Sequence, residues 1–384
     1  MKTQVRSRLR GLHLIACALL GAAPAAYAQV TAEHGPIDFT VEGYANATTG
    51  AANLHADTDY FDDGDLRVDA ALRGLARLRI PSGPDVGLRL VVEASPEDDV
   101  ELAEASVLIF GDAGRLEFGE RQGLPDVLTG YAPNNFTFTG AEFGPASGPS
   151  LDPAGGLQTA FLDDELGAQL RELSVLGFAA SLSDDRSAKA LYVSPKWRGL
   201  LGGLSYASNA KDPRFTDLVQ AGLTHDRYWK HNALHVGGSY SFARAGESAG
   251  QRDLRSVNLG ATLVVNYDWM LGASLTYDGT SGVSRSAPRG ASIDEAWGSV
   301  ASLNYNRGSW TAGAFVQWST REGDVDRAGD DRLRALEAGL SYRVSTKLRF
   351  YGAWYYFDFD DEGGELAADR HEGSIVLVGL RATL

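Results

Sequence analysis

The sequence predicts an all-β chain that forms a transmembrane antiparallel β-barrel. Its clearest support is residues 65–80, where charged and apolar side chains alternate. Successive strand side chains point to opposite faces, so this pattern places charge on one face and hydrocarbon on the other. Beyond residue 28 the chain has no run of 18 apolar residues, which excludes a spanning helix. When a sheet with one apolar and one charged face closes into a barrel, all of its backbone N–H and C=O groups can form hydrogen bonds within the lipid bilayer.

The first 28 residues predict a cleaved signal peptide. Four basic residues precede an apolar core at residues 14–23, and Ala26-Tyr27-Ala28 forms a small-x-small cleavage site before Gln29. Cys17 also suggests a lipoprotein signal, but the apolar run before it is shorter than usual and continues past it. Because Cys17 is the single cysteine, the mature chain has neither disulfides nor thiolate metal sites. Residues 29–384 are predicted to be one barrel domain.

The charge of the mature chain excludes one class of partner. The whole chain has a net charge of −15, and removal of the four basic leader residues lowers it by four, to −19. Nucleic-acid binding requires a basic surface, so we expect no nucleic-acid partner. Acids concentrate in predicted loops, such as residues 57–65 and 358–362, where they would attract cations.

The strand pattern continues along most of the mature chain. Its first strand is predicted at residues 37–47 and its last at residues 372–384, and alternation recurs at the following segments: residues 65–80, 86–93, 115–121, 188–195, 200–208, 217–226, 231–244, 253–266, 271–279, 294–306, 310–321, 333–344 and 347–358. The length fits a barrel of 16 strands. Apolar stretches at residues 156–161 and 173–182 would make 18, and both counts are even, as a bacterial barrel requires.

The lengths of the connections between strands distinguish the two ends of the predicted barrel. Short connections alternate with long polar ones, a pattern that outer-membrane barrels show. Aromatic residues recur at the short connections: Trp197, Tyr228, Trp229, Tyr267, Trp269 and Trp310. Amphipathic rings at such positions predict a girdle at the membrane interface, with ordinary turn-flanking core aromatics as the alternative. The final strand ends the chain on a half-apolar pattern, which suits a barrel whose last strand pairs back to its first.

Several segments together resemble the general diffusion porins of Gram-negative outer membranes. They are Gly64-Asp65-Leu66-Arg67-Val68-Asp69, Glu104-Ala105-Ser106-Val107-Leu108, Gly114-Arg115-Leu116-Glu117-Phe118-Gly119-Glu120-Arg121, Leu191-Tyr192-Val193-Ser194-Pro195, Leu204-Ser205-Tyr206 and the last strand. Glu142-Phe143-Gly144 is similar to the Pro-Glu-Phe-Gly-Gly of the porin constriction loop, with Ala141 and Pro145 as departures. Leu384 stands where the family usually ends in Phe.

The resemblance implies a long third loop that folds inward and narrows the pore, and residues 122–186 occupy its place. Its acidic side is expected to comprise Asp126, Glu142, Asp152, Asp163, Asp164 and Glu165. The facing basic wall is expected to comprise Arg67, Arg73, Arg77, Arg89, Arg115 and Arg121. Acids opposite arginines in a narrow passage would create a transverse field that filters solutes by charge. Alternatively, the arginines pair with Asp69, Glu93 and Glu117 to hold the wall together.

Other functional classes find little support. The chain lacks a Gly-x-Ser-x-Gly elbow, a His-Glu-x-x-His motif and a P-loop, so we expect no catalytic residue and no cofactor. His231 and His235 share a strand face without a third ligand, and the acidic stretch near Gly64 does not fit a calcium loop, so no metal site is predicted. A barrel hydrolase would need an adjacent serine and histidine, for which His235 and Ser239 are the nearest match. A secreted β-solenoid would need a short fixed repeat, which is absent.

The resulting expectation is an outer-membrane channel for passive diffusion of ions and small hydrophilic solutes, with a modest cation preference. A substrate-specific channel is the main alternative. The family resemblance implies a homotrimer. Outer-membrane lipid and lipopolysaccharide are the expected surroundings.

Overall fold

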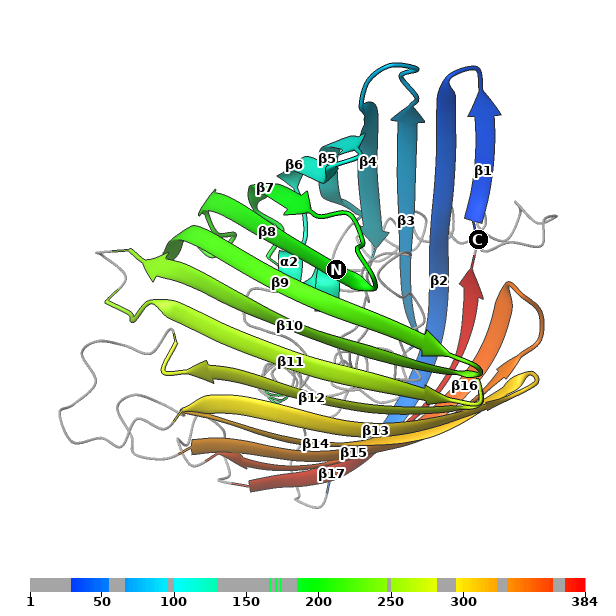
Figure 1. The fold of residues 1–384 in the computed structure, drawn as a ribbon. Coiled ribbons are helices and arrows are strands. Elements are labelled where there is room, and N and C mark those ends of the chain that lie inside the picture. Colours follow the sequence, from blue (N-terminus) through cyan, green and yellow to red (C-terminus); the bar gives the residue numbers. More distant parts are fainter. Residues whose placement is uncertain are drawn as a thin grey trace, which may run out of the picture.

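The period-two pattern becomes a long sequence of antiparallel strands in the computed structural model. The structure describes residues 29–54, 66–94, 100–129, 185–246, 250–281, 295–322, 330–361 and 370–383, together with Leu166, Leu170 and Leu173. Almost all of these residues lie in strands that neighbour one another in chain order (Figure 1). The chain is therefore all-β, as its alternation predicts.

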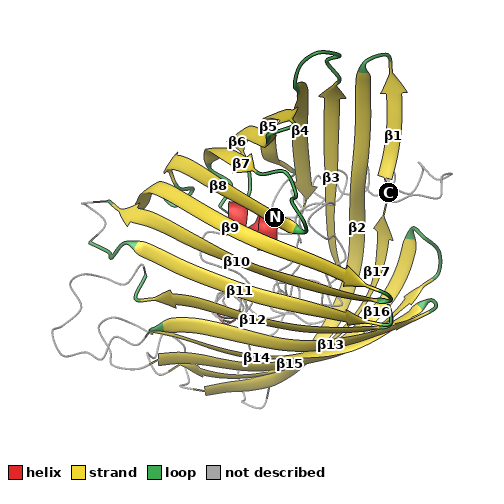
Figure 2. Cartoon of the chain, in the orientation of Figure 1, coloured by secondary structure: helices red, strands yellow, loops and turns green. Residues whose placement is uncertain are grey.

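The strands follow one another around a single sheet. They are β1 (Gln29–His34), β2 (Ile37–Leu54), β3 (Arg67–Leu78), β4 (Asp85–Ala94), β5 (Glu101–Gly111), β6 (Gly114–Glu120), β7 (Ala188–Val193), β8 (Leu200–Asn209), β9 (Phe215–Trp229), β10 (Asn232–Ala245), β11 (Leu254–Val265), β12 (Trp269–Gly279), β13 (Ala296–Arg307), β14 (Trp310–Glu322), β15 (Asp330–Arg343), β16 (Leu348–Asp361) and β17 (Arg370–Thr383). One short helix, α2 (Leu124–Thr129), follows β6 and is the red element in Figure 2.

Strands β2 to β17 form a closed barrel of 16 strands. Each strand pairs with the next in antiparallel register, and β17 pairs back to β2 from Thr383↔Tyr44 to Gly373↔Leu54. The N-terminal strand β1 pairs with the remaining part of the same edge of β2, from Gln29↔Glu42 to His34↔Ile37. β1 and β17 therefore cover the edge of β2 one after the other, so no long row of backbone groups stays unpaired there.

The two faces of the strands differ as the sequence predicts. On β3 and β4, Leu72, Leu88 and Leu90 are exposed on the outer face, whereas Arg73 and Arg89 point inward and are largely covered. The same alternation continues on later strands. An outer face of exposed hydrocarbon suits contact with lipid acyl chains.

Short turns gather at one end of the barrel. They join β9 to β10, β11 to β12, β13 to β14 and β15 to β16, and each contains between two and four residues. The six aromatic residues predicted to form a girdle are all at least 39% exposed, and they lie at this end. The exposure favours the girdle over turn-flanking core aromatics, because core side chains would be covered. We call this the short-turn end and the opposite one the long-connection end.

The structure settles the strand number and adds two elements that the pattern does not predict. The barrel has 16 strands, so the preferred count is confirmed. Leu173, which begins one of the two extra strand candidates, is helical, and residues 156–161 lie outside the described residues. Strand β1 and helix α2 are both too short to give a clear periodicity.

Candidate functional site

A cluster of opposite charges covers the inner face of β2 to β6. We call it the charged wall, and it comprises Glu42, Arg73, Arg89, Glu104, Arg115, Glu117 and Arg121. Each strand contributes through its inward positions, which recur every second residue. The alternation that creates a lipid-facing surface thus also brings these charges together inside the barrel.

Glu104 lies at the centre of the charged wall. Its carboxylate is 2.8 Å from Nη2 of Arg89 and 3.1 Å from Nη1 of Arg121, and its side chain is completely buried. It also accepts a hydrogen bond of 3.2 Å from the backbone N–H of Gln122. Glu104 therefore joins two arginines and the first residue of the inserted region, residues 122–186.

Glu117 extends this network along β6. Its carboxylate is 3.0 Å from Nε of Arg121 and 3.8 Å from Nε of Arg115, and it accepts a 2.6 Å hydrogen bond from Ser106. A separate pair, Arg73 and Glu42, has a distance of 2.7 Å. The seven residues of the charged wall comprise four arginines and three glutamates, so the wall has an excess of one positive charge.

Four of the six predicted wall arginines belong to this cluster, and two lie elsewhere. Arg77 pairs with Asp85 at 2.6 Å near the short-turn end. Arg67 begins β3 at the opposite end. Of the alternative partners, Glu117 does bind these arginines, but Glu93 binds Arg186 at 2.7 Å. The side chain of Asp69 lies outside the described residues.

The predicted acidic side of the pore falls almost wholly outside the described residues. Asp126 lies in α2, although its side chain is not described, and Glu142, Asp152, Asp163, Asp164 and Glu165 lie beyond the described ranges. Sequence reasoning missed Glu42 and Glu104 as members of the site. Both follow the inward alternation of their strands, and that alternation could have identified them.

Helix α2 shows where the inserted region begins inside the barrel. Leu124 and Leu128 are buried and pack against β7 and β8. Two glycines of the wall permit this approach: a Cβ atom at Gly203 would lie 2.8 Å from Leu124 Cδ1, and one at Gly222 would lie 2.9 Å from Leu128 Cδ1. The backbone N–H of Leu124 donates a 3.1 Å hydrogen bond to the side chain of Gln220. The inserted region therefore starts by turning inward.

A second part of the inner wall is apolar. We call it the apolar wall, and its buried members lie on β13 to β17: Val300, Phe315, Leu333, Ala335, Tyr355, Phe357, Phe359, Ile375 and Leu377. Leu166, Leu170 and Leu173 of the inserted region pack against it and are fully buried. The amide of Gln317 donates a 2.9 Å hydrogen bond to the carbonyl oxygen of Leu173.

Between these two sectors the inner wall is mainly neutral and polar, with the buried carboxylates of Asp226 and Asp278 as its charged members. Buried serine, threonine, asparagine and glutamine residues follow one another from β9 to β14: Gln220, Thr224, Ser239, Ser241, Ser256, Asn258, Thr262, Ser274, Thr276, Ser302, Asn304, Gln317 and Ser319. Some pair across strands, as Asn258 does with Thr276 at 2.7 Å. The described inner surface therefore has a sector of paired charges, a mainly uncharged polar sector and an apolar sector.

The inserted region ends at another buried charge. The carboxylate of Asp185 pairs with the ammonium of Lys189 at 3.2 Å and accepts hydrogen bonds from the backbone N–H groups of Ser187 and Lys211. Burial raises the pKa of Asp185, but the charge of Lys189 and these hydrogen bonds outweigh that effect and leave the pKa below its ordinary value. This cluster fixes the chain where it enters β7.

The nearest match to a catalytic pair does not form one. His235 Nδ1 lies 2.8 Å from Asp226, and the same carboxylate binds Lys196 from the neighbouring short turn. Ser239 is four residues further along the strand that carries His235, so about 13 Å separates their Cα atoms in extended chain. Asp226 thus links β9 to His235 on β10 and to Lys196 between β7 and β8, at the short-turn end.

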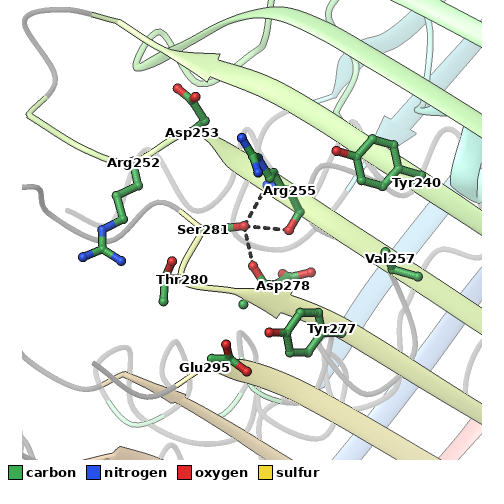
Figure 3. A pocket seen from close by; sticks show the side chains of 11 residues that line it. Tyr240, Arg252, Asp253, Arg255, Val257, Tyr277, Asp278, Thr280, Ser281 and Glu295 are labelled. Atoms are coloured by element: carbon green, nitrogen blue, oxygen red, sulfur yellow. Dashed lines mark hydrogen bonds between the residues drawn. The ribbon is translucent and has the colours of Figure 1, made fainter. Parts of the chain in front are cut away.

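Figure 3 shows a pocket of about 560 Å³ at the long-connection end of β10 to β12. Tyr240 and Tyr277 line it from exposed positions of the strands, on the outside of the barrel. The hydroxyl of Ser281 accepts a 2.7 Å hydrogen bond from the N–H of Arg255 and lies 2.6 Å from the carbonyl oxygen of the same residue. These bonds hold the end of β12 against β11, outside the lumen.

Comparison with known proteins agrees with this architecture. In the described part of the chain, no α-helix has the length and apolarity to cross a membrane. No curated protein sequence matches the chain. OmpF of Salmonella typhi, in complex with daunomycin, superposes with a TM-score of 0.63 at 12% identity, covering 92% of this chain and 100% of that one.

Two further solved structures show the same fold. The anion-selective porin from Comamonas acidovorans gives a TM-score of 0.59 at 15% identity, covering 91% of this chain and 100% of that one. A loop L8 deletion mutant of OmpT, an outer membrane protein of Vibrio cholerae, gives 0.57 at 12% identity, covering 90% and 99%. Residues 15–362 match the family model described as Gram-negative porin. The chain therefore belongs to the Gram-negative porin family and is a channel of the bacterial outer membrane.

Proposed function

We propose that the protein forms a water-filled channel for passive diffusion of ions and small hydrophilic solutes. The observation that carries this proposal is the closed barrel with an apolar outer face and a charged and polar inner face. Charged side chains inside a membrane barrel are costly unless they line an aqueous path or pair with one another. No step of this function needs a cofactor or a catalytic residue.

The charged wall is proposed to form one side of the constriction. Arg73 lies on β3, Arg89 on β4, Arg115 on β6 and Arg121 directly after β6, and their carboxylate partners come from β2, β5 and β6. A cluster with alternating charges and little net excess orients dipolar solutes by its local field. Arg67 and Arg77 would act nearer the two mouths of the pore. The acidic side would come from the six carboxylates predicted in the inserted region.

A modest cation preference is proposed from the overall charge. The mature chain carries a net charge of −19, which follows from −15 for the full chain and four leader cations. Carboxylates at the mouth concentrate cations and so raise their rate of entry. The charged wall, with its single positive excess, opposes this effect only weakly. The anion selectivity named for the Comamonas porin belongs to that protein.

We further propose that the protein is a homotrimer and that its subunits meet through the outer face of β3 to β6. These four strands contain neither tryptophan nor tyrosine, whereas exposed examples of both occur on later strands from β8 to β16. Aromatic belts mark surfaces at the lipid headgroups. An exposed apolar face without tryptophan or tyrosine fits contact with another copy of the chain. One solved neighbour is described as the trimer form of OmpT.

A bulky substitution tests this interface. Leu88→Trp on β4 should lower the fraction of trimer, measured by mass photometry in detergent, because the indole has no room between packed subunits. Leu275→Trp on β12 is the matched control, since Leu88 and Leu275 are 48% and 45% exposed. Both variants should fold. Equal trimer fractions would reject β3 to β6 as the interface.

Export through a signal peptide cleaved after Ala28 is part of the proposal, as is an outer-leaflet environment of lipopolysaccharide. The protein to test is therefore the mature chain, which begins at Gln29. The refolded chain in a planar bilayer should give discrete current steps, arriving in threes. A salt gradient should give a reversal potential of the cation-preferring sign. A reversal potential of the anion-preferring sign would refute only the proposed cation preference. A folded barrel that carries no current would refute the channel function.

A substrate-specific channel is the second candidate, favoured by the docking of the inserted region on the inner wall. Such a channel would show saturable block of its current by one solute, which a diffusion channel does not. A barrel hydrolase has no comparable support, because His235 is bound to Asp226 and far from Ser239 along its strand.

A further inference from the structure

The inner faces of β15, β16 and β17 carry opposite charges at their two ends. At the long-connection end, the inward carboxylates of Asp331 and Asp361 lie directly opposite each other and are buried. Arg321 on β14 pairs with Asp331 at 3.1 Å and compensates one of the two. At the short-turn end, the inward charges of the same three strands are basic.

Three arginines form this basic end, and we call them the arginine row. Arg343 on β15 is directly opposite Arg349 on β16, and Arg349 is directly opposite Arg381 on β17. Directly opposite residues of antiparallel strands point to the same face, with Cα atoms about 4.5–5.5 Å apart. Asn46 on β2 comes next to Arg381 and is buried inside the barrel. The row therefore runs across the inner face of three neighbouring strands.

The neighbouring strands bring no carboxylate to this end of the barrel. Residues 297–321, 338–357 and 373–383 include the short-turn ends of β13 to β17 and contain neither aspartate nor glutamate. Residues 322–337 and 358–372, which lie towards the long connections, contain more acidic than basic residues. Like charges that lie directly opposite each other repel, so the arginine row favours the approach of an anion from the lumen.

The side chains of the arginine row are held in different ways. The guanidinium of Arg381 lies over the ring of Tyr44, 4.7 Å from its centroid, and this arginine is only 4% exposed. Arg343 is exposed, and its Nη2 donates a 3.1 Å hydrogen bond to the carbonyl oxygen of Gly308. A guanidinium has five N–H donors, so Arg343 can also bind an acceptor from solution. Arg349 lies between them and is partly exposed.

This arrangement suits a small molecule with two oxyanion groups. The paired N–H groups of a guanidinium match the oxygens of a phosphate or a carboxylate in a bidentate manner. Arg343 and Arg349 are the accessible members of the row, and their lateral spacing of about 5 Å allows each to take one group of the same molecule. The covered Arg381 adds positive charge behind them.

We propose that the arginine row is a binding site for small solutes that carry two phosphate or carboxylate groups, at the short-turn mouth of the lumen. Short turns face the periplasm in bacterial outer-membrane barrels, so the site takes these solutes from the periplasmic side. Entry through the lumen rests on the proposed channel function, whereas binding needs no current. The site is separate from the charged wall, whose arginines have carboxylate partners.

Isothermal titration calorimetry of the mature chain in detergent tests the site, with pyrophosphate as the probe at low salt. Arg343→Gln together with Arg349→Gln should raise the dissociation constant about tenfold or more, because both charge-assisted contacts are lost. The matched control is Arg227→Gln together with Arg307→Gln, which removes the same charge from outward positions at the short-turn end and should leave the constant unchanged. Equal constants for the two double variants would overturn the proposal.

A single substitution keeps the test independent of the folding of the double variant. Arg343→Gln changes an exposed side chain and should weaken pyrophosphate binding about threefold or more, since one guanidinium is lost. An unchanged dissociation constant in this variant would contradict the site.

Competition tests the class of ligand. Succinate, with two carboxylates, should displace pyrophosphate, and inorganic phosphate, with one group, should displace it less effectively. Equal competition by inorganic phosphate and succinate would overturn the assignment to solutes with two groups.

Bilayer recordings test where the site lies. Pyrophosphate added on one side should reduce the potassium chloride current more than the same addition on the other side, because acidic residues at the long-connection end repel it. This one-sided block should disappear in the variant with Arg343→Gln and Arg349→Gln. Equal block from both sides, or block that persists in the variant, would overturn the placement at the short-turn mouth.

These readouts separate the two proposals. A folded chain that binds pyrophosphate through the arginine row but carries no current would refute the diffusion channel and keep the site. A chain that conducts but does not bind pyrophosphate would keep the channel and refute the site.

Discussion

Neutralising Glu104 is the most informative single change in the charged wall. The side chain is completely buried and joins Arg89 at 2.8 Å, Arg121 at 3.1 Å and the backbone of Gln122 at 3.2 Å. Glu104→Gln keeps the shape but leaves two buried guanidinium groups short of one counter-charge. Breaking a buried ion pair in this way costs about 3–5 kcal/mol of folding free energy. We therefore expect a loss of that size in urea-induced unfolding of the barrel in lipid vesicles.

Two further variants test whether the loss has the stated cause. Arg121→Met in the Glu104→Gln background removes one uncompensated charge and should recover part of the stability. Glu33→Gln is the control, because Glu33 pairs with Arg79 at an exposed position and such pairs contribute little. If Glu104→Gln and Glu33→Gln shift the unfolding midpoint equally, the buried ion pairs of the charged wall do not stabilise the barrel. Glu104→Gln should also shift the reversal potential towards anions.

The contact of α2 with the inner wall and the end of the inserted region give two further predictions. Gly203→Ala should lower the unfolding midpoint and disturb the current, because the new Cβ would lie 2.8 Å from Leu124 Cδ1 of α2 and 2.7 Å from the Tyr192 carbonyl oxygen. Gly202→Ala is the control, because its Cβ would meet atoms only at 3.5 Å or more. Equal effects of the two substitutions would contradict tight packing around Gly203. The lowered pKa of Asp185 means that its charged form stabilises the fold above about pH 4, its unfolded value, and that this contribution disappears as the pH falls through the folded value. Asp185→Asn should therefore lower the midpoint at neutral pH and reduce its acid dependence, and an acid dependence equal to that of the unaltered chain would contradict the assignment.

The barrel could be predicted because the alternation of charged and apolar side chains is visible within each strand, and the same alternation decides which face of the whole sheet meets lipid. In residues 65–80 six of the eight odd-numbered positions are charged, and this segment contains β3 with its inward arginines. The turns that separate the strands also carry recognisable signals, so the two ends of the barrel could be predicted from the sequence. The strand number stayed open between 16 and 18, because a short apolar run does not distinguish a strand from a helix. Strand β1 was not predicted, because a strand of six residues is too short to show a clear alternation of apolar and polar side chains.

The pairing inside the charged wall could be predicted only in part. Alternation states that Arg89, Glu104 and Glu117 face inward, but which carboxylate meets which arginine depends on the register between strands. That register places Val91 opposite Glu104 after an irregularity between β4 and β5. A single-residue shift of this kind has no signature in the sequence pattern. Alternation therefore suffices to place Glu42 and Glu104 on the inner face, but it does not assign either carboxylate to its arginine.

The apolar wall was missed because its strands carry apolar side chains on both faces over part of their length. In Tyr355-Tyr356-Phe357-Asp358-Phe359 the inward residues are Tyr355, Phe357 and Phe359, so the aromatic side faces the lumen. A rule that assigns apolar residues to lipid places them on the wrong side. The matching signal was the helical spacing of Leu166, Leu170 and Leu173, and a short apolar run of this kind does not distinguish helix from strand.

The dependence of single-channel conductance on salt concentration tests the central claim most directly. The chain refolded from Gln29 would be inserted in a planar bilayer and its current recorded at increasing concentrations of potassium chloride. A diffusion channel predicts ohmic current whose conductance rises in proportion to the salt concentration. A conductance that saturates at low salt, or a folded barrel without current, would contradict passive diffusion through an open lumen.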